Sequence, residues 1–365
     1  MSFNSKILQY DAYTYSTNRE TITLKQQSLK LVQKSNGYGV EPQKILIKVH
    51  AASLNPIDII LYNSAYPALK WWFGEQGIGR DYSGVIADIG DTAGAQTGYK
   101  VGDEVVGLYS HAFGKGTVSE YIEIDPNVDK SIVKKPQSLS FNEAASFPLV
   151  YGTAHLMINN HDLKGKKILV FGGSTSVGKY IIQLARIRGA KIIVTTNSPR
   201  SNDLVTRLGS THQIDYTKNK NLLNPVLESV KESGEFDYIY DTCGNSDLFP
   251  QVSKILKPRS ANSTYVTCVG DAKLDYGKAH IMQSFFDNFK ALFRNLKGKL
   301  GLGINYELAL LKTGKEWMED AKKEFDEGQL ELFIDSVHKW DNFTDALDRV
   351  RFNKANGKVV IETNV

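Results

Sequence analysis

The sequence has few of the features that would place it in several common protein classes. Its two cysteines, Cys243 and Cys268, are too few for a four-cysteine structural zinc site. No run of 18 apolar residues occurs, so no segment is expected to span a membrane. The first residues carry no apolar run typical of a secretory signal. We therefore expect a reduced, cytoplasmic compartment.

The sequence also lacks a large excess of either positive or negative charge. The chain has 44 basic and 40 acidic residues, a net charge of +4, which argues against a nucleic-acid partner. Its hydrophobic fraction of 41% and charged fraction of 23% are those of a soluble globular protein. A length of 365 residues suggests about two domains.

The most informative stretch runs from residue 166 to residue 216. The apolar run 168–171 predicts a buried strand, and it leads directly into the glycine-rich turn 172–178. Apolar residues then recur at helical spacing up to Gly189, and 191–196 predicts a second strand. Strand, glycine turn, helix and strand form a βαβ unit, whose turn can bind a pyrophosphate at the helix N-terminus. The alternative is an ordinary tight turn.

The end of the second predicted strand indicates which dinucleotide binds. An NAD-binding unit places Asp or Glu about 20 residues beyond the turn. Here residues 195–200 contain no carboxylate, and none follows until Asp203. Arg200 and Lys179 could instead pair with a 2′-phosphate, which favours NADPH. Arg200 could equally be a solvated loop charge.

The remaining chain predicts β-structure at both ends and further α/β units between them. Short runs such as 13–25 and 44–49 predict strands of a small β-barrel, with a turn at 36–39. Further strands are expected at 236–240 and 264–269, with a helix at 223–233 between β-rich runs. The C-terminal part predicts a helix at 343–352 and a closing strand at 358–362.

Several short motifs stand in an order that resembles the medium-chain dehydrogenase/reductase superfamily, in its zinc-free quinone-oxidoreductase-like branch, as a fungal member. They are Asn-Pro-x-Asp at 55–58, Gly-x-Asp-x-x-Gly-Val at 79–85, Lys-x-Gly-Asp-x-Val at 100–105, Pro-Leu-x-x-x-Thr-Ala at 148–154 and Gly-Lys-Val-Val-Ile at 357–361. The resemblance covers nearly the whole chain.

The resemblance implies an α/β protein with two domains and a dimer. Residues 1–130 and 310–365 would form a GroES-like β-barrel substrate domain, and 131–309 a doubly wound parallel Rossmann domain with NADPH in the cleft. The residues expected to bind the cofactor are Thr153, Gly173, Ser174, Thr175, Ser176, Val177, Gly178, Asn197, Ser198, Arg200, Tyr216, Cys243 and Gly270. Tyr216 resembles an adenosine-side tyrosine, or is simply a half-buried aromatic. Asp241 either lies beside the nicotinamide ribose or caps the next helix.

Two departures from the superfamily bear on chemistry. Zinc-dependent relatives have a Cys and a Gly-His-Glu as metal ligands, where this chain has Asn55 and Gly79-Arg80-Asp81, so no metal is expected. The branch usually reads Gly-Gly-Val-Gly where this chain reads Thr175-Ser176-Val177-Gly178, which places side chains near the pyrophosphate.

Without a metal, hydride addition to a quinone or an α,β-unsaturated carbonyl needs a hydrogen-bond donor for the developing oxyanion. The amide of Asn55 is the first candidate and the hydroxyl of Tyr62 the second. Asn55 could instead be only a turn residue before Pro56. Asp58 and Asp81 are expected to hold loops.

Two aromatic stretches leave other functions open. Residues 280–300 predict an amphipathic, aromatic and basic helix. It could be a lid, a helix on an anionic lipid surface, or one packed on the domain junction. Trp71-Trp72-Phe73 could line a substrate mouth, touch lipid or belong to the barrel core. The alternatives to a quinone or enone reductase are therefore a non-catalytic nucleotide-binding or stress-associated relative and a peripheral protein of a lipid droplet or organelle membrane.

Overall fold

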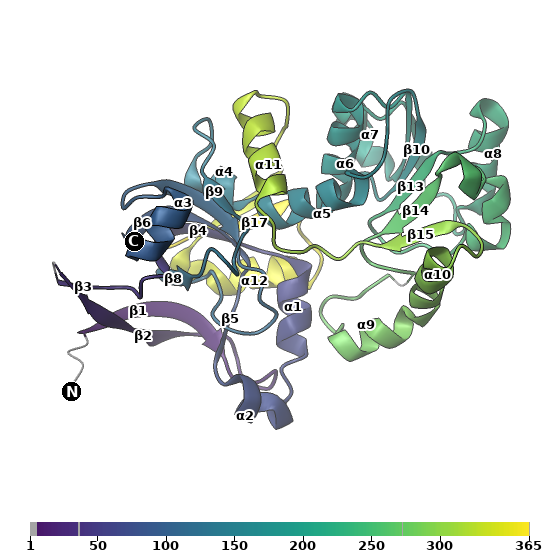
Figure 1. Cartoon of the computed structure of the whole chain (residues 1–365). Coiled ribbons are helices and arrows are strands. Elements are labelled where there is room, and N and C mark those ends of the chain that lie inside the picture. Colours follow the sequence, from purple (N-terminus) through teal and green to yellow (C-terminus); the bar gives the residue numbers. More distant parts are fainter. Residues whose placement is uncertain (1–5, 36, 272, 365) are drawn as a thin grey trace. The chain divides into compact units, whose positions relative to one another are not determined.

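The computed structural model of the chain describes residues 6–35, 37–271 and 273–364. It divides into two compact units (Figure 1). The first comprises Met1–Leu149, Tyr276–Ile281 and Lys312–Val365, and the second Val150–Asp275 and Met282–Leu311. Residues 131–149, which the sequence assigned to the second domain, lie in the first unit. The reason is that β9 (Ile132–Lys134) pairs with β7 (Glu104–Leu108).

The first unit is mainly β-structure. Its two sheets run in the orders β3-β2-β1-β5 and β16-β17-β4-β6-β7-β9, with β8 paired to β4. The other strands are β1 (Lys6–Tyr15), β2 (Thr23–Lys34), β3 (Gly37–Gly39), β4 (Ile45–Leu54), β5 (Gln76–Gly77), β6 (Asp81–Ile89), β8 (Tyr121–Ile124), β16 (Ile334–Lys339) and β17 (Lys358–Glu362). The helices are α1 (Pro56–Asn63), α2 (Lys70–Phe73), α3 (Asp91–Thr97), α4 (Phe141–Ala145), α11 (Glu316–Asp326) and α12 (Phe343–Arg351).

The core of the first unit joins its N-terminal strands to its C-terminal helix. The ring of Tyr13 on β1 stacks on Phe343 of α12 at a centroid distance of 4.0 Å, and its hydroxyl donates to the carbonyl of Trp340. Alternating residues of β4, such as Ile45, Ile47 and Val49, are fully buried in the same cluster. The C-terminal segment is therefore an integral part of this unit.

The second unit is built on a six-stranded sheet in which every neighbouring pair is parallel. Its order, β12-β11-β10-β13-β14-β15, is that of a doubly wound dinucleotide-binding sheet. The strands are β10 (Lys167–Phe171), β11 (Ile192–Asn197), β12 (His212–Asp215), β13 (Tyr238–Asp241), β14 (Thr264–Thr267) and β15 (Asn305–Leu308). The order reverses between β10 and β13, which is where such sheets bind ligands.

Helices cover both faces of this sheet (Figure 1). Successive side chains of β10 alternate between the faces. Leu169 and Phe171 pack with Val226 and Ala291, on the face covered by α8 and α10. Ile168 and Val170 point to the opposite face of the sheet, and α6 contacts β10. The helices of this unit are α5 (Pro148–Ile158), α6 (Ser176–Ile187), α7 (Asn202–Leu208), α8 (Leu223–Ser233), α9 (Ile281–Asp287) and α10 (Phe289–Lys299).

Most predicted elements are confirmed, but three differ in detail from the structure. The run 13–25 is not one strand, because residues 16–22 turn between β1 and β2, held by the bond from the N–H of Ser16 to Glu20. The helix expected over 280–300 breaks at Asn288 into α9 and α10. Of the turn predicted at 36–39, Asn36 lies outside the described residues and Gly37–Gly39 forms β3.

Candidate functional site

The candidate cofactor site of the second unit begins where β10 ends. Gly172 has a left-handed backbone, with φ of +78°, which turns the chain sharply toward α6. Thr175 is the N-cap of α6, and its hydroxyl accepts a hydrogen bond of 2.9 Å from the N–H of Gly178. The same hydroxyl bonds Thr242 at 2.8 Å. The Thr175 side chain, which the sequence placed near the pyrophosphate, is therefore turned into the fold and does not obstruct the loop.

The glycines of this turn are required by close packing. A Cβ atom on Gly178 would lie 2.1 Å from the carbonyl oxygen of Gly172. One on Gly173 would lie 2.8 Å from Cβ of Thr195 on β11. Both contacts are shorter than real side chains show, so the helix approaches the sheet only because these positions carry no side chain.

The turn presents unused hydrogen-bond donors. In the described part of the chain, the backbone N–H groups of Ser174, Ser176 and Val177 have no partner. All three residues are only half-buried. Donors at a helix N-terminus, reinforced by the helix dipole, suit a phosphate. This set of donors fits the pyrophosphate of a dinucleotide, and Gly173 to Gly178 are the residues that would hold it.

The end of β11 is polar, and its side chains are hydrogen-bonded to one another. Asn197 is buried, accepts a bond of 2.8 Å from the Thr195 hydroxyl and donates to Asn202 at 2.7 Å. Ser198, which follows it, is also buried, whereas Arg200 is exposed. Lys179 is only 1% exposed. Of the two cations proposed for a 2′-phosphate, only Arg200 is therefore accessible.

A buried carboxylate organises the loop after β13. Asp241 accepts hydrogen bonds from the N–H groups of Cys243, Gly244 and Asn245 at 2.8 to 3.0 Å, and from the hydroxyl of Tyr265 at 2.9 Å. Burial raises its pKa to about 6, although these donors lower it. Asp241 thus positions the loop that carries Cys243, and no α-helix follows for it to cap.

The other predicted cofactor residues also lie in the second unit. Tyr216 follows β12 and is 45% exposed, so its ring is accessible for stacking. Gly270 follows β14 with φ of +80°, and a Cβ atom there would meet the Asn288 side chain at 2.0 Å. Thr153 lies on α5 and is buried. Tyr216, Cys243 and Gly270 follow the carboxyl ends of β12, β13 and β14. These ends lie at the same edge of the parallel sheet as the glycine turn after β10.

The two predicted catalytic residues lie in the first unit, and one of them, Asn55, contacts a buried ion pair. Asp81 is fully buried, and its Oδ2 accepts bonds from Lys358 Nζ at 2.7 Å, Asn55 Nδ2 at 2.9 Å and the Ser53 hydroxyl at 3.1 Å. Its other oxygen accepts from the N–H of Leu149 at 2.8 Å. Lys358 also donates to Oδ1 of Asn55. The amide of Asn55 is therefore fixed in one orientation, between a cation and an anion.

Lys358 was not among the residues predicted for the site. It is only 4% exposed and begins β17, 303 residues after Asn55. Its signal in the sequence was the Gly-Lys-Val-Val-Ile motif, to which no role had been given. Sequence spacing gives no indication that this lysine contacts Asn55 and Asp81.

A second buried pair lies next to the first. The N–H of Asn55 donates to Asp58 Oδ2 at 2.8 Å, and Arg80 Nη1 lies 3.8 Å from Asp58 Oδ1, which has no hydrogen-bond partner. Arg80 also donates to the carbonyls of Gly79 and Ala112. Burial raises the pKa of Asp58 from 3.8 to about 6, with Arg80 opposing the shift. Asp58 and Arg80 hold the start of α1, as the sequence suggested for Asp58.

Tyr62 is half-buried, and its hydroxyl is already used. It donates to the carbonyl of Glu20 at 2.7 Å, and its ring packs edge-on against Tyr15. Burial raises the pKa of the Tyr62 hydroxyl. As a donor to an oxyanion, Tyr62 would first have to release Glu20, which makes it the weaker candidate. Asn55 is itself only 1% exposed, and it is also the N-cap residue of α1.

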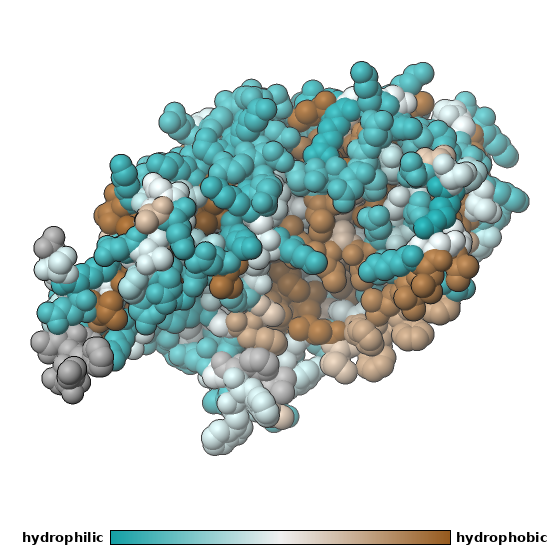
Figure 2. Space-filling model, viewed as in Figure 1, coloured by the Kyte–Doolittle hydropathy of each residue, from teal (hydrophilic) through white to brown (hydrophobic). Residues whose placement is uncertain are grey.

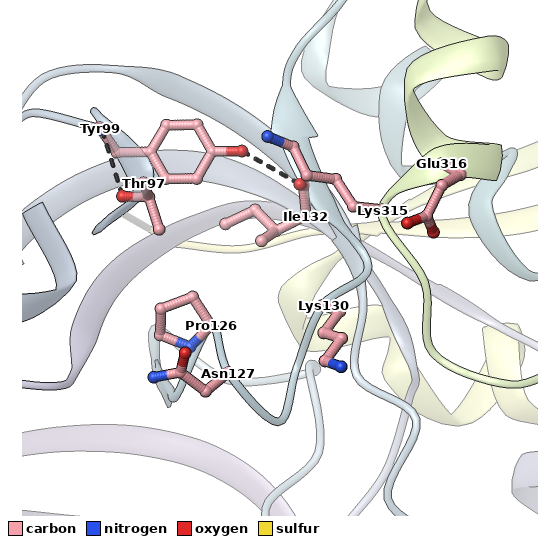
Figure 3. Close-up of a pocket in the computed structure, with 8 residues that line it drawn as sticks. All are labelled: Thr97, Tyr99, Pro126, Asn127, Lys130, Ile132, Lys315 and Glu316. Atoms are coloured by element: carbon pink, nitrogen blue, oxygen red, sulfur yellow. Dashed lines mark hydrogen bonds between the residues drawn. The ribbon is translucent and has the colours of Figure 1, made fainter. Parts of the chain in front are cut away.

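A separate pocket of the first unit contains none of these residues (Figure 3). Its lining is formed by Thr97, Tyr99, Pro126, Asn127, Lys130, Ile132, Lys315 and Glu316. The Tyr99 hydroxyl donates to the carbonyl of Ile132 at 3.0 Å. Elsewhere in this unit, Trp71 and Trp72 are 94% and 82% exposed, so they do not belong to the barrel core.

The described residues contain neither a cluster of metal-ligand side chains nor a membrane-spanning helix. Over residues 6–35, 37–271 and 273–364, no group of three or more His, Cys, Asp or Glu side chains is arranged to hold a metal ion. Within the same ranges no helix is long and apolar enough to cross a membrane.

Comparison with known proteins identifies both units. Residues 41–137 match the family described as alcohol dehydrogenase GroES-like domain, and residues 176–297 match zinc-binding dehydrogenase. Protein YIM1 of Candida glabrata is 35% identical over 344 residues, which are 88% of this chain and 91% of that protein.

Two solved structures share the fold. The quinone oxidoreductase from Coxiella burnetii superposes with a TM-score of 0.71 at 22% identity, over 97% of this chain and 99% of that one. A crotonyl-CoA carboxylase/reductase, AntE, solved in complex with NADP, gives a TM-score of 0.71 at 16% identity, over 98% and 95%. The expected GroES-like domain and parallel dinucleotide-binding domain are confirmed.

The packing of the turn predicts the effect of a single methyl group. A Gly178→Ala variant must push α6 away from Gly172, and we expect its affinity for a nicotinamide dinucleotide to fall at least about tenfold. Calorimetric titration measures this. Gly94→Ala in α3 is the matched control, because the added Cβ atom would lie no closer than 3.8 Å to any neighbouring atom. Equal affinities of wild type and Gly178→Ala would contradict the assignment of the turn.

The buried carboxyl of Asp58 predicts a pH-dependent stability. Because its pKa is raised on folding, its contribution is complete below pH 3.8 and declines as the pH rises to about 6, by at most about 3 kcal/mol. The free energy of unfolding of Asp58→Asn, minus that of wild type, should therefore rise across this window. Urea denaturation over the same pH range measures the difference.

Asp103→Asn provides a control of opposite sign. Although burial raises the pKa of Asp103, hydrogen bonds from Lys134 and Lys100 hold it below its ordinary value. Its contribution is therefore lost as the pH falls. A difference for Asp58→Asn that does not change with pH would show that this carboxyl does not titrate in the window.

Proposed function

Because the chain belongs to the medium-chain dehydrogenase/reductase superfamily, we propose that it is an NADPH-dependent reductase of quinones or α,β-unsaturated carbonyl compounds. The observation that carries the proposal is the turn between β10 and α6. There, unpaired N–H groups stand at the end of a parallel strand, in a sheet whose order reverses next to it.

A preference for NADPH is proposed from the end of β11. In an NAD-binding unit this position carries a carboxylate for the ribose hydroxyls, and here it carries Asn197, whose amide is bonded internally. A carboxylate would repel a 2′-phosphate, whereas the exposed guanidinium of Arg200 can pair with it. The NADP complex of AntE is consistent with this preference.

The bound cofactor would supply a hydride, and the chain's own residues would orient the acceptor. In the proposal, Asn55 donates to the acceptor's carbonyl oxygen, where negative charge develops. Its Oδ1 is bonded by Lys358, so the amide cannot flip, and Nδ2 gives one of its two N–H groups to Asp81. The second N–H is the donor assigned to the acceptor. Protonation of the product is left to water, because the two carboxylates beside Asn55, Asp58 and Asp81, are fully buried and already accept hydrogen bonds.

Two similar structures support the acceptor class. The quinone oxidoreductase and the crotonyl-CoA carboxylase/reductase both carry the fold, and their names describe hydride chemistry on conjugated carbonyl systems. The first test is a titration with NADPH and NADH followed by turnover on a panel of quinones and enones. Binding with turnover supports the proposal, and binding without turnover on any acceptor supports a non-catalytic relative.

The role of Arg200 predicts a selective loss of affinity. In Arg200→Ala, the dissociation constant for NADPH should rise about tenfold or more, because a charge-assisted contact with a dianion is lost, while that for NADH stays the same. Lys191→Ala is the matched control, since Lys191 precedes the amino end of β11 and is exposed. An equal change for both cofactors would refute the selective role.

The role of Asn55 predicts a change in the rate constant. In Asn55→Ala, kcat should fall about 100-fold or more, with little change in NADPH affinity, because an oxyanion donor acts in the transition state. Ser53→Ala is the control, since it also loses a bond to Asp81 but removes no donor from the amide. If both variants lose the same modest activity and thermal stability, Asn55 is only structural.

A further inference from the structure

The outer surface of α9 and α10 carries a stripe of large apolar side chains. They recur three or four residues apart, so they lie on one side of the helical segment. We call this set the apolar stripe: Met282, Phe285, Phe286, Phe289, Phe293, Leu296 and Leu300. Each is at least half exposed, with Phe286 at 66% and Phe289 at 63%. Figure 2 shows brown and tan side chains gathered over this segment.

The stripe faces outward because the opposite side of the segment is fixed to the sheet. Ala291 is fully buried against the core, and Gly298 lies so close to β15 that a Cβ atom would be 3.0 Å from the Tyr306 backbone. At the break between the helices, Asn288 accepts a bond of 2.8 Å from the N–H of Asp271. A rotation that buried the stripe would lose all these contacts.

The charges around the stripe are almost all positive. From residue 278 to 300 the only acidic side chain is Asp287, against four lysines and one arginine. Arg294 is paired with Asp271 at 2.6 Å, but Lys290, Lys297 and Lys299 are exposed and lie beside the stripe. Lys297 Nζ lies 4.7 Å from the Phe293 ring centroid. Apolar side chains flanked by lysines are the pattern of helices that lie in a membrane interface.

We propose that the apolar stripe and its lysines form a docking surface for an anionic phospholipid bilayer. The rings would enter the boundary between headgroups and acyl chains, and the ammonium groups would meet lipid phosphates and carboxylates. A second copy is the less favourable occupant, because an isologous contact would bring lysines together with only Asp287 to pair them. This surface is independent of the proposed reductase activity.

The test is co-flotation of the full-length protein with vesicles. Vesicles of phosphatidylcholine mixed with phosphatidylserine should carry the protein upward, and binding should weaken as salt increases. Vesicles of phosphatidylcholine alone should bind at least about fivefold less. Absence of flotation with the anionic vesicles would overturn the proposal, as would equal binding to both vesicle types.

Variants separate the two components of the surface. A Phe286→Ser/Phe289→Ser double variant should lower binding at least about tenfold, because two exposed rings no longer enter the bilayer. Lys290→Glu/Lys297→Glu should lower it similarly and remove most of the salt dependence. Phe352→Ser and Lys323→Glu are the controls, being exposed residues of the first unit that should leave binding unchanged.

Folding and self-association are followed in the same samples. Circular dichroism shows whether a variant is folded. Sedimentation velocity shows whether the stripe joins two copies. A wild-type dimer that becomes monomeric in Phe286→Ser/Phe289→Ser, with no vesicle binding by the wild type, would assign the surface to a second copy and overturn the lipid proposal.

Discussion

The buried pair of Asp81 and Lys358 is the interaction on which the first unit depends most. It connects β6 to β17 near the end of the chain, and its hydrogen bonds extend to Ser53, Asn55 and Leu149. Removing two charges from water is costly, and the cost is offset only when every polar atom has a partner. The four donors to Asp81 meet this condition. Loss of one partner from such a pair costs about 3–5 kcal/mol.

The same pair links the fold to the proposed chemistry. Asn55 is both the N-cap of α1 and the amide held between Lys358 and Asp81. The rigidity that makes it a good structural residue is also what an oxyanion donor requires, since a donor that must reorient during the reaction contributes less.

The second unit depends on a different constraint, the absence of side chains in a turn. Gly173 and Gly178 allow α6 to approach β10 and β11, and the cap by Thr175 leaves three N–H groups unpaired at the helix start. The sequence has Thr175 and Ser176 where the resemblance implies glycines, which places two side chains near the expected pyrophosphate. Because Thr175 points inward to Gly178 and Thr242, the substitution preserves the donors.

The βαβ unit, the parallel sheet and most helices followed from the sequence by itself, because strand alternation, helical spacing and turn glycines are local properties. The expected cofactor residues came from the resemblance to the superfamily, and most of them follow the ends of successive strands. Only the tertiary structure decided which side chains are accessible: Lys179 is buried although it is charged, and the stripe from Met282 to Leu300 is exposed although it is apolar. It alone brought Lys358 to Asn55, because contacts between residues 303 positions apart depend on how the whole chain packs and leave no local pattern.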